Sequence, residues 1–329
     1  MGEIRPKTED GTTEPQEPER TSGIVRVVGV SPEIENEALE FWKQKFDNQE
    51  LHETEREKAP DEIMMIKKVL AHLSEFTSIY GGKPVPLKME NIHIIDPDQF
   101  SAEAKQKLGN TKGWYDLSSQ SATIISDRNN IDKTNLFHEI THELMHFSEF
   151  SSLMPHTVVE KDGSSNTLMA QRRNGFSVAV MKDNKPEFYF NDLNEAITEE
   201  LVARFIDKYL LSDQSVVSSD YFMKVINSLG HGDAEGSKFS IPDIDKYLMI
   251  TSFSSRYNEE REKLWRLIVD IKAKNSDKFK SPEDFFNIFA REYFTGRLLP
   301  VARLIEKTYG KGSFRELGKE TKAKNQFKK

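Results

Sequence analysis

The segment FHEITHELMHF, residues 137–147, contains the pattern HExxH twice, and the two copies share His142. On an α-helix, residues four apart lie on one face about one turn apart, so two imidazoles at this spacing can reach one metal ion. His138 and His146 would lie about 12 Å apart along the axis, at about 1.5 Å per residue, and cannot both bind that ion. The segment therefore predicts a helix with one of two alternative metal-binding registers.

The same segment is strongly amphipathic as a helix. At about 100° per residue, its large apolar side chains fall on one face and the three histidines on the opposite face. These apolar residues are Leu136, Phe137, Ile140, Leu144 and Phe147. Such a pattern is typical of a helix that lies between a hydrophobic core and a cleft.

Hydrophobic periodicity elsewhere predicts an α+β fold. Most of the chain has helical periodicity, whereas short apolar runs in the first half predict strands. We expect helices over residues 33–48, 61–80, 192–211, 257–274, 281–292 and 297–309, and near 215–229 and 242–251. We expect strands at 91–95 and 121–126 and a hairpin formed by 175–181 and 186–190. A small β-containing half with the histidine helix would thus precede a mostly helical half.

Composition indicates where the domain begins and ends and which kinds of partner molecule the chain can have. Residues 1–22 are rich in Glu, Thr, Pro and Arg and predict a disordered tail, and 318–329 predict a basic tail, which leaves one domain over 23–317. A net charge of −8 argues against nucleic acid and anionic membranes as partners. The chain has no cysteine, and no apolar run approaches the ~18 residues of a membrane span. We expect a soluble, cytoplasmic protein.

A metal site built on this helix needs a third ligand. Catalytic zinc is usually held by three protein ligands and a water molecule. No cysteine is present, and the downstream histidines, His156 and His231, lie in segments that look like loops. Glu195 and Glu199 are four residues apart and fall on one face of the predicted helix 192–211. An ordinary solvated helix face would show the same spacing, so both interpretations remain at this point.

The pair of motifs HELMH and NEAITE, over about residues 115–210, resembles the gluzincin group of zinc metallopeptidases and their small minigluzincin-like domains. The resemblance implies a zincin-like fold and one Zn²⁺ per chain, bound by His142, His146 and Glu195. It also implies that Glu199 accepts a hydrogen bond from a ligand histidine, which orients the ring. The chain departs from the thermolysin-like pattern in having Glu199 in place of Asp. It also has 49 positions between His146 and Glu195, a much longer gap that the predicted hairpin partly fills.

The second HExxH copy is the favoured register. It is followed by the apolar Phe147, as in many zincin helices, and THELMHFSEF resembles the active-site helix of the family along its length. The first copy lies closer to the start of the helix, where less scaffold holds it. His138 then lies near the ligands or in the cleft without binding the ion, or is an ordinary surface histidine. The alternative register, with His138 and His142 as ligands and Glu139 as base, remains open.

The expected activity is hydrolysis of peptide bonds in a peptide or protein substrate. Glu143 would act as general base toward a water activated by the metal ion. Tyr257, or else His231, would stabilise the oxyanion, and residues 121–126 would be an edge strand that pairs with the substrate, unless they form an ordinary internal strand. One alternative is a catalytically inactive zincin-like module that binds metal or protein. Another is a helical interaction protein whose histidines bind nothing.

Overall fold

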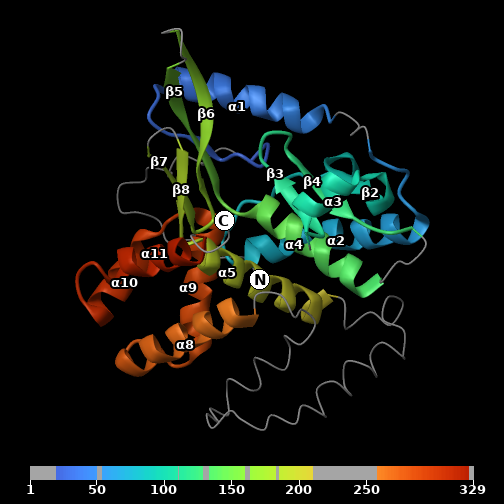
Figure 1. The fold of residues 1–329 in the computed structure, drawn as a ribbon. Helices are drawn as coiled ribbons and strands as arrows, with labels where there is room; N and C mark the ends of the chain where they lie inside the picture. Colours follow the sequence, from blue (N-terminus) through green and yellow to red (C-terminus); the bar gives the residue numbers. More distant parts are fainter. Residues whose placement is uncertain are drawn as a thin grey trace, which may run out of the picture.

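The computed structural model describes residues 20–49, 54–109, 111–128, 133–159, 164–182, 185–209 and 258–325. Its fold is α+β, with two small sheets and a set of helices that pack between and below them (Figure 1). The helices before the histidine segment are α1 (Pro32–Asp47), α2 (Pro60–Ile79) and α3 (Ala102–Leu108), with 3₁₀ turns at Met89–Asn91 and Pro97–Gln99. The later helices are α4 (Lys133–Ser148), α5 (Asn191–Tyr209), α8 (Asn258–Lys274), α9 (Pro282–Thr295), α10 (Leu299–Tyr309) and α11 (Ser313–Asn325).

The first sheet is small and lies against the histidine helix. Its strands are β2 (Ile92–Ile95), β4 (Ser121–Ile125) and β3 (Gly113–Asp116), in that spatial order. β2 and β4 run parallel, and β3 is antiparallel to β4 at one edge. β4 is therefore the central strand, and the expectation that residues 121–126 form an edge is wrong. The edge strand beside α4 is β3.

The second sheet has the order β1-β5-β6-β7-β8. Its strands are β1 (Arg26–Val27), β5 (Ser151–Val159), β6 (Ser165–Asn174), β7 (Ser177–Lys182) and β8 (Lys185–Tyr189). The hairpin of β7 and β8 confirms the sequence prediction. The long hairpin of β5 and β6 was not predicted, and it places His156 in a strand rather than a loop. Both hairpins come between α4 and α5 in the sequence. They account for the long gap between the HELMH and NEAITE motifs.

Helix α4 has the amphipathic structure that its sequence predicts. Leu136, Phe137, Ile140, Leu144 and Phe147 are all buried in the main hydrophobic core. That core continues through Ile92, Ile94, Ala122 and Ile124 of the first sheet and through apolar residues of α2, α5, α8 and α9. α5 packs against α4 on one side and against α8 and α9 on another. The histidine face of α4 is thus held between α5 and the edge of the first sheet.

The described structure reaches into both segments that were predicted as tails. Residues 1–19 lie outside the described part of the chain, but Arg20 and Ser22 are buried, so the ordered structure includes residues 20–22. At the other end, α11 runs through residue 325, and Gly318 O accepts a hydrogen bond from Phe190 N at 3.1 Å. A Cβ atom at Gly318 would lie 2.6 Å from the Phe190 ring, so this helix packs closely on the junction of β8 and α5.

The remaining predicted helices are confirmed where the structure describes them: α1, α2, α5, α8, α9 and α10. The predicted helices near 215–229 and 242–251 lie outside the described residues. In the described part of the chain, none of the helices is both long and apolar enough to cross a membrane.

Candidate metal centre

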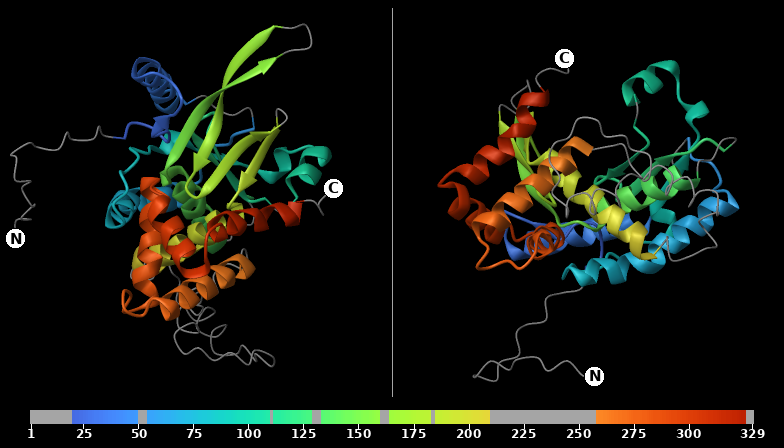
Figure 2. Two further views of the ribbon diagram at one scale, coloured as in Figure 1. Left: turned by 90° about the vertical axis from the view of Figure 1, so that its left-hand side faces the viewer. Right: turned by 90° about the horizontal axis from the view of Figure 1, so that it is seen from below.

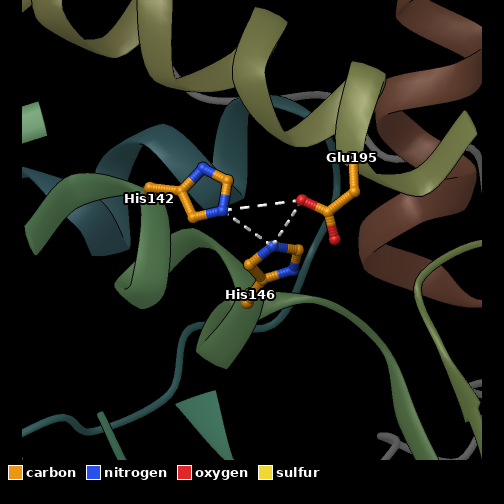
Figure 3. A group of neighbouring side chains, drawn as sticks. All are labelled: His142, His146 and Glu195. Carbon is orange, nitrogen blue, oxygen red and sulfur yellow. Dashed lines mark hydrogen bonds and ion pairs between the residues drawn. The ribbon is translucent and has the colours of Figure 1, made fainter. Parts of the chain in front are cut away.

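The second HExxH copy and Glu195 come together at one point between α4 and α5 (Figure 3). His142 Nε2 lies 3.1 Å from His146 Nε2. Glu195 Oε2 lies 3.6 Å from His142 Nε2 and 3.4 Å from His146 Nε2. Two imidazole nitrogens and one carboxylate oxygen therefore form a nearly equilateral triangle. This cluster could hold a metal ion.

The donor set matches the requirements of tetrahedral zinc. Ligand bonds of about 2.0–2.1 Å at tetrahedral angles place neighbouring donor atoms roughly 3.3 Å apart. The three edges of the triangle, 3.1, 3.4 and 3.6 Å, lie close to this spacing. Two nitrogens and one oxygen are also donors that zinc prefers. The residues present thus fit this ion without rearrangement.

Glu199 lies one helical turn beyond Glu195 on α5 and contacts two histidines. Its Oε1 lies 3.0 Å from His142 Nδ1, and its Oε2 lies 2.9 Å from His138 Nε2. Burial opposes a charged carboxylate here, but the contacts with His138 and His142 outweigh it and lower the pKa of Glu199 well below its ordinary value. A carboxylate on Nδ1 leaves the Nε2 lone pair of His142 directed at the cluster.

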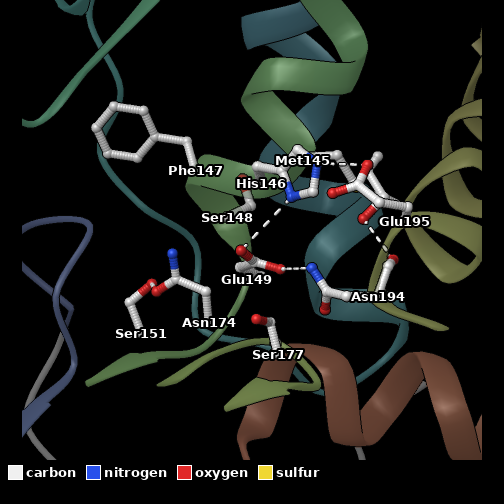
Figure 4. Close-up of polar contacts among 12 residues, drawn as sticks. Met145, His146, Phe147, Ser148, Glu149, Ser151, Asn174, Ser177, Asn194 and Glu195 are labelled. Atoms are coloured by element: carbon white, nitrogen blue, oxygen red, sulfur yellow. Dashed lines mark hydrogen bonds and ion pairs between the residues drawn. The ribbon is translucent and has the colours of Figure 1, made fainter. Parts of the chain in front are cut away.

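His146 has a corresponding carboxylate that the sequence analysis missed. Glu149 Oε1 lies 3.5 Å from His146 Nδ1, and Glu149 Oε2 accepts a hydrogen bond from Asn194 Nδ2 at 3.0 Å (Figure 4). Asn194 Oδ1 accepts from Phe176 N at 2.7 Å. The asparagine of NEAITE therefore joins α5 to the end of α4 and to the turn between β6 and β7. The available signal was the i, i+3 spacing of Glu149 from His146.

Gly175 makes this junction possible. Its φ is +51°, and a Cβ atom would lie 2.3 Å from Asn194 Oδ1 and 2.4 Å from Glu149 Oε2. A larger residue would collide with both side chains and would also be strained at this φ. The β6–β7 turn can therefore approach the site only with glycine at this position.

The two ends of the site are fixed by groups far away in sequence. Arg20 donates to the carbonyl oxygens of Phe147, Ser148 and Glu149, at 3.2, 2.7 and 2.8 Å, and so caps the C-terminal end of α4. Tyr293 on α9 lies with its hydroxyl 2.9 Å from Thr198 Oγ1 and donates to Met145 O at 3.4 Å. The two contacts of Tyr293 therefore join α4 to α5.

Charge in the cluster favours protonated imidazoles next to carboxylates. Burial lowers the pKa values of His142 and His146, but the facing carboxylates raise both values by more. The net shift places the pKa of His146 well above its ordinary value. Burial raises the pKa of Glu195, yet the charge of His146 outweighs it and the net shift is downward. A divalent cation would replace these protons, because it supplies positive charge at the same point.

Glu143 lies beside the cluster on the same helix and belongs to a cavity of about 330 Å³. It is buried, and burial raises its pKa above the ordinary value. A Cβ atom at Gly113 would lie 3.0 Å from Glu143 Cγ, so the edge strand β3 passes directly over this carboxylate. The cavity is lined by Gly113, Trp114, Tyr115, His142, Glu143, His146, Glu149, Gln171, Asn174, Ser177, Phe188, Asn191, Asn194 and Glu195.

His138 lies outside the triangle. Its Nε2 contacts Glu199 and its Nδ1 lies 3.8 Å from Glu139 Oε1. Burial opposes protonation, but the contacts with Glu139 and Glu199 prevail and raise the pKa of His138 to about 9. Among the described residues, the group of histidine and carboxylate side chains that could share an ion is the one formed by the second register. Tyr257 and His231, expected to stabilise an oxyanion, lie outside the described residues.

Comparison with protein-family models, with curated proteins and with solved structures found no match to this chain.

Proposed function

We propose that this protein is a zinc-dependent peptidase of the gluzincin type with a zincin-like fold. The observation that carries the proposal is the triangle of His142, His146 and Glu195, whose donor atoms have the spacing of tetrahedral zinc ligands. Glu149 and Glu199 support it, because each lies at the Nδ1 atom of one of these histidines. A surface histidine cluster without a ligand has no need of such an arrangement.

Bound zinc would supply an activated water and polarise the carbonyl of the scissile bond. Glu143 is placed for the proton transfers, because it adjoins His142 but is not part of the triangle, and lines the same cavity. Its carboxylate takes a proton from the attacking water and later delivers it to the leaving amine. The burial of Glu143 favours the protonated state that this second step requires.

The edge strand β3 supports an extended peptide as substrate. One side of β3 pairs with β4, and β3 is the last strand of its sheet. A substrate strand that added to the other side would pass over Glu143, since Gly113 lies against that carboxylate. The absence of a Cβ atom at Gly113 permits this close approach of strand and base.

The test is a digest of a broad peptide library with zinc-loaded wild type and with Glu143→Gln. Wild type should cleave, and a zinc chelator should stop cleavage. Glu143→Gln keeps the shape of the side chain but cannot take the proton, so it should bind zinc and cleave roughly 10²–10⁴-fold more slowly. Equal cleavage by both proteins would contradict the mechanism. Stoichiometric zinc without cleavage of any peptide would instead support an inactive metal-binding module.

A further inference from the structure

The second sheet opens beside the candidate metal centre. In the described residues, β6 and β7 pair only at Arg173–Val178 and Asn174–Ser177. Beyond these pairs, β6 remains paired with β5 on its other side, and β7 remains paired with β8. The two hairpins diverge from this junction (Figure 2). The edge of β6 over residues 165–171 that faces β7 therefore forms no ladder within the described chain.

A β-bulge causes this divergence. Ser152 of β5 pairs with Arg173, but the next residue, Leu153, pairs with Gln171, so Arg172 is an extra residue in β6. Such a bulge bends the strand and increases its twist. Arg172 Nη1 donates to Ala179 O at 2.6 Å, just beyond the last ladder pair of β7. A long side chain thus stands between the two strands where a direct backbone hydrogen bond would otherwise close the sheet.

The opening continues into the cavity of the candidate site. Gln171 and Asn174 of β6 and Phe188 of β8 line the same cavity as the metal cluster. Met169 precedes Gln171 by two residues and therefore lies on the same face of β6. Met169 is 37% exposed, and Phe188 on the neighbouring hairpin is 36% exposed. The free part of β6 is about 20 Å long, at about 3.3 Å per residue.

We propose that the free edge of β6 binds an extended segment of the substrate polypeptide by strand addition, several residues away from the cleaved bond. This inference rests on the proposed peptidase function. The occupant is an extended chain, because only a strand satisfies a row of backbone N–H and C=O groups, and Met169 on this strand favours an apolar side chain beside it. The substrates are therefore unfolded polypeptides or long loops. A folded domain without a free extended segment would not bind at this edge.

The experiment measures binding separately from cleavage. Full-length Glu143→Gln is mixed with fluorescein-labelled, reduced and carboxymethylated α-lactalbumin, an unfolded polypeptide, and fluorescence anisotropy is recorded. We expect binding, and no binding of the native calcium-loaded form. Met169→Lys in the same background should weaken binding roughly tenfold, because it places a charge on the apolar path.

Leu168→Lys is the matched control. Leu168 is 57% exposed and adjoins Met169 on the opposite face of β6, so this change should leave binding unaltered. Equal loss in both variants, unaltered binding in Met169→Lys, or equal binding of native α-lactalbumin would overturn the inference.

Short peptides keep the two proposals distinguishable. Hexapeptides reach the cavity but not the outer part of β6, so their cleavage by wild type tests the peptidase function alone. Cleavage of hexapeptides without binding of the unfolded polypeptide would remove the β6 surface and leave the peptidase. Met169-dependent binding without any cleavage would support the surface and contradict the peptidase.

Discussion

The two HExxH copies on α4 have the same residue types but different neighbours on α5. His146 of the second copy has Glu195 at its Nε2 atom and Glu149 at its Nδ1 atom, and it shares Glu195 with His142. His138 of the first copy has carboxylates at both ring nitrogens, Glu199 and Glu139, with no further donor in a shared triangle among the described residues. The helix that packs against α4 therefore decides which histidines can share an ion.

The largest expected difference between the two copies concerns their glutamates. Glu143 lines the cavity, whereas Glu139 contacts His138 and does not line it. Glu143→Gln should therefore lower the rate of peptide hydrolysis roughly 10²–10⁴-fold, and Glu139→Gln should leave most of it. The rates of both zinc-loaded variants on one peptide substrate would show this. An equal loss of rate in the two variants would contradict the assignment of Glu143 as the general base.

Glu199 joins the two copies, so its replacement should weaken the metal site without removing a ligand. Glu199→Gln takes away the carboxylate at His142 Nδ1. Loss of such a partner typically costs roughly 10–100-fold in metal affinity. Competition with a zinc-binding dye would measure the change. Wild-type affinity in this variant would show that Glu199 pairs with His138 but does not support His142 as a ligand.

Glu149 should have a smaller effect of the same kind. Its contact with His146 Nδ1 is longer, at 3.5 Å, than that of Glu199 with His142. We expect Glu149→Gln to weaken zinc binding by roughly tenfold, at the lower end for such partners. The same dye competition applies, and Gln at this position can still accept from Asn194. A larger loss than in Glu199→Gln would reverse the order of the two carboxylates.

The smallest effect is a titration at the first copy. The pKa of His138 is raised from 6.5 to about 9 because Glu139 and Glu199 favour the protonated ring. A raised pKa in the folded state contributes stability that is fully present below about pH 6.5 and is lost as the pH rises through about 9. Thermal unfolding of zinc-free protein should show this loss, and His138→Gln should remove the part due to this ring. An NMR midpoint for His138 near 6.5 would contradict the assignment.

Much of the architecture follows from local sequence pattern. The apolar stripe of α4 predicted both its helix and its buried face, and the run 175–190 predicted the β7–β8 hairpin. The long β5–β6 hairpin was missed because β6 is half exposed on both faces and lacks the alternation of a buried strand. β3 was missed because only four residues form it, with no apolar run. Strand order is a tertiary property, so the sequence could not assign the sheet edge to β3.

The residues of the candidate site also differ in how far the sequence could predict them. Helical spacing offered the three histidines of α4 and the pair Glu195 and Glu199 as candidate ligands, because it fixes which side chains share a face. The resemblance to gluzincins then favoured His142, His146 and Glu195 among them. Asn194 and Arg20 could not be assigned their roles, since these depend on the β6–β7 turn and on the N-terminal segment reaching the end of α4. The contacts of Asn194 and of Arg20 with Glu149 join residues 45 and 129 positions apart, which no local pattern records.

The proposed activity depends on one zinc ion bound by His142, His146 and Glu195. The most direct test of this binding is metal analysis of purified wild type, His146→Ala and His138→Ala after loading with zinc and removal of the excess. We expect about one zinc per chain in wild type and in His138→Ala, and none in His146→Ala. Zinc retained in His146→Ala but lost from His138→Ala would establish the first register and rule out His146 as a ligand.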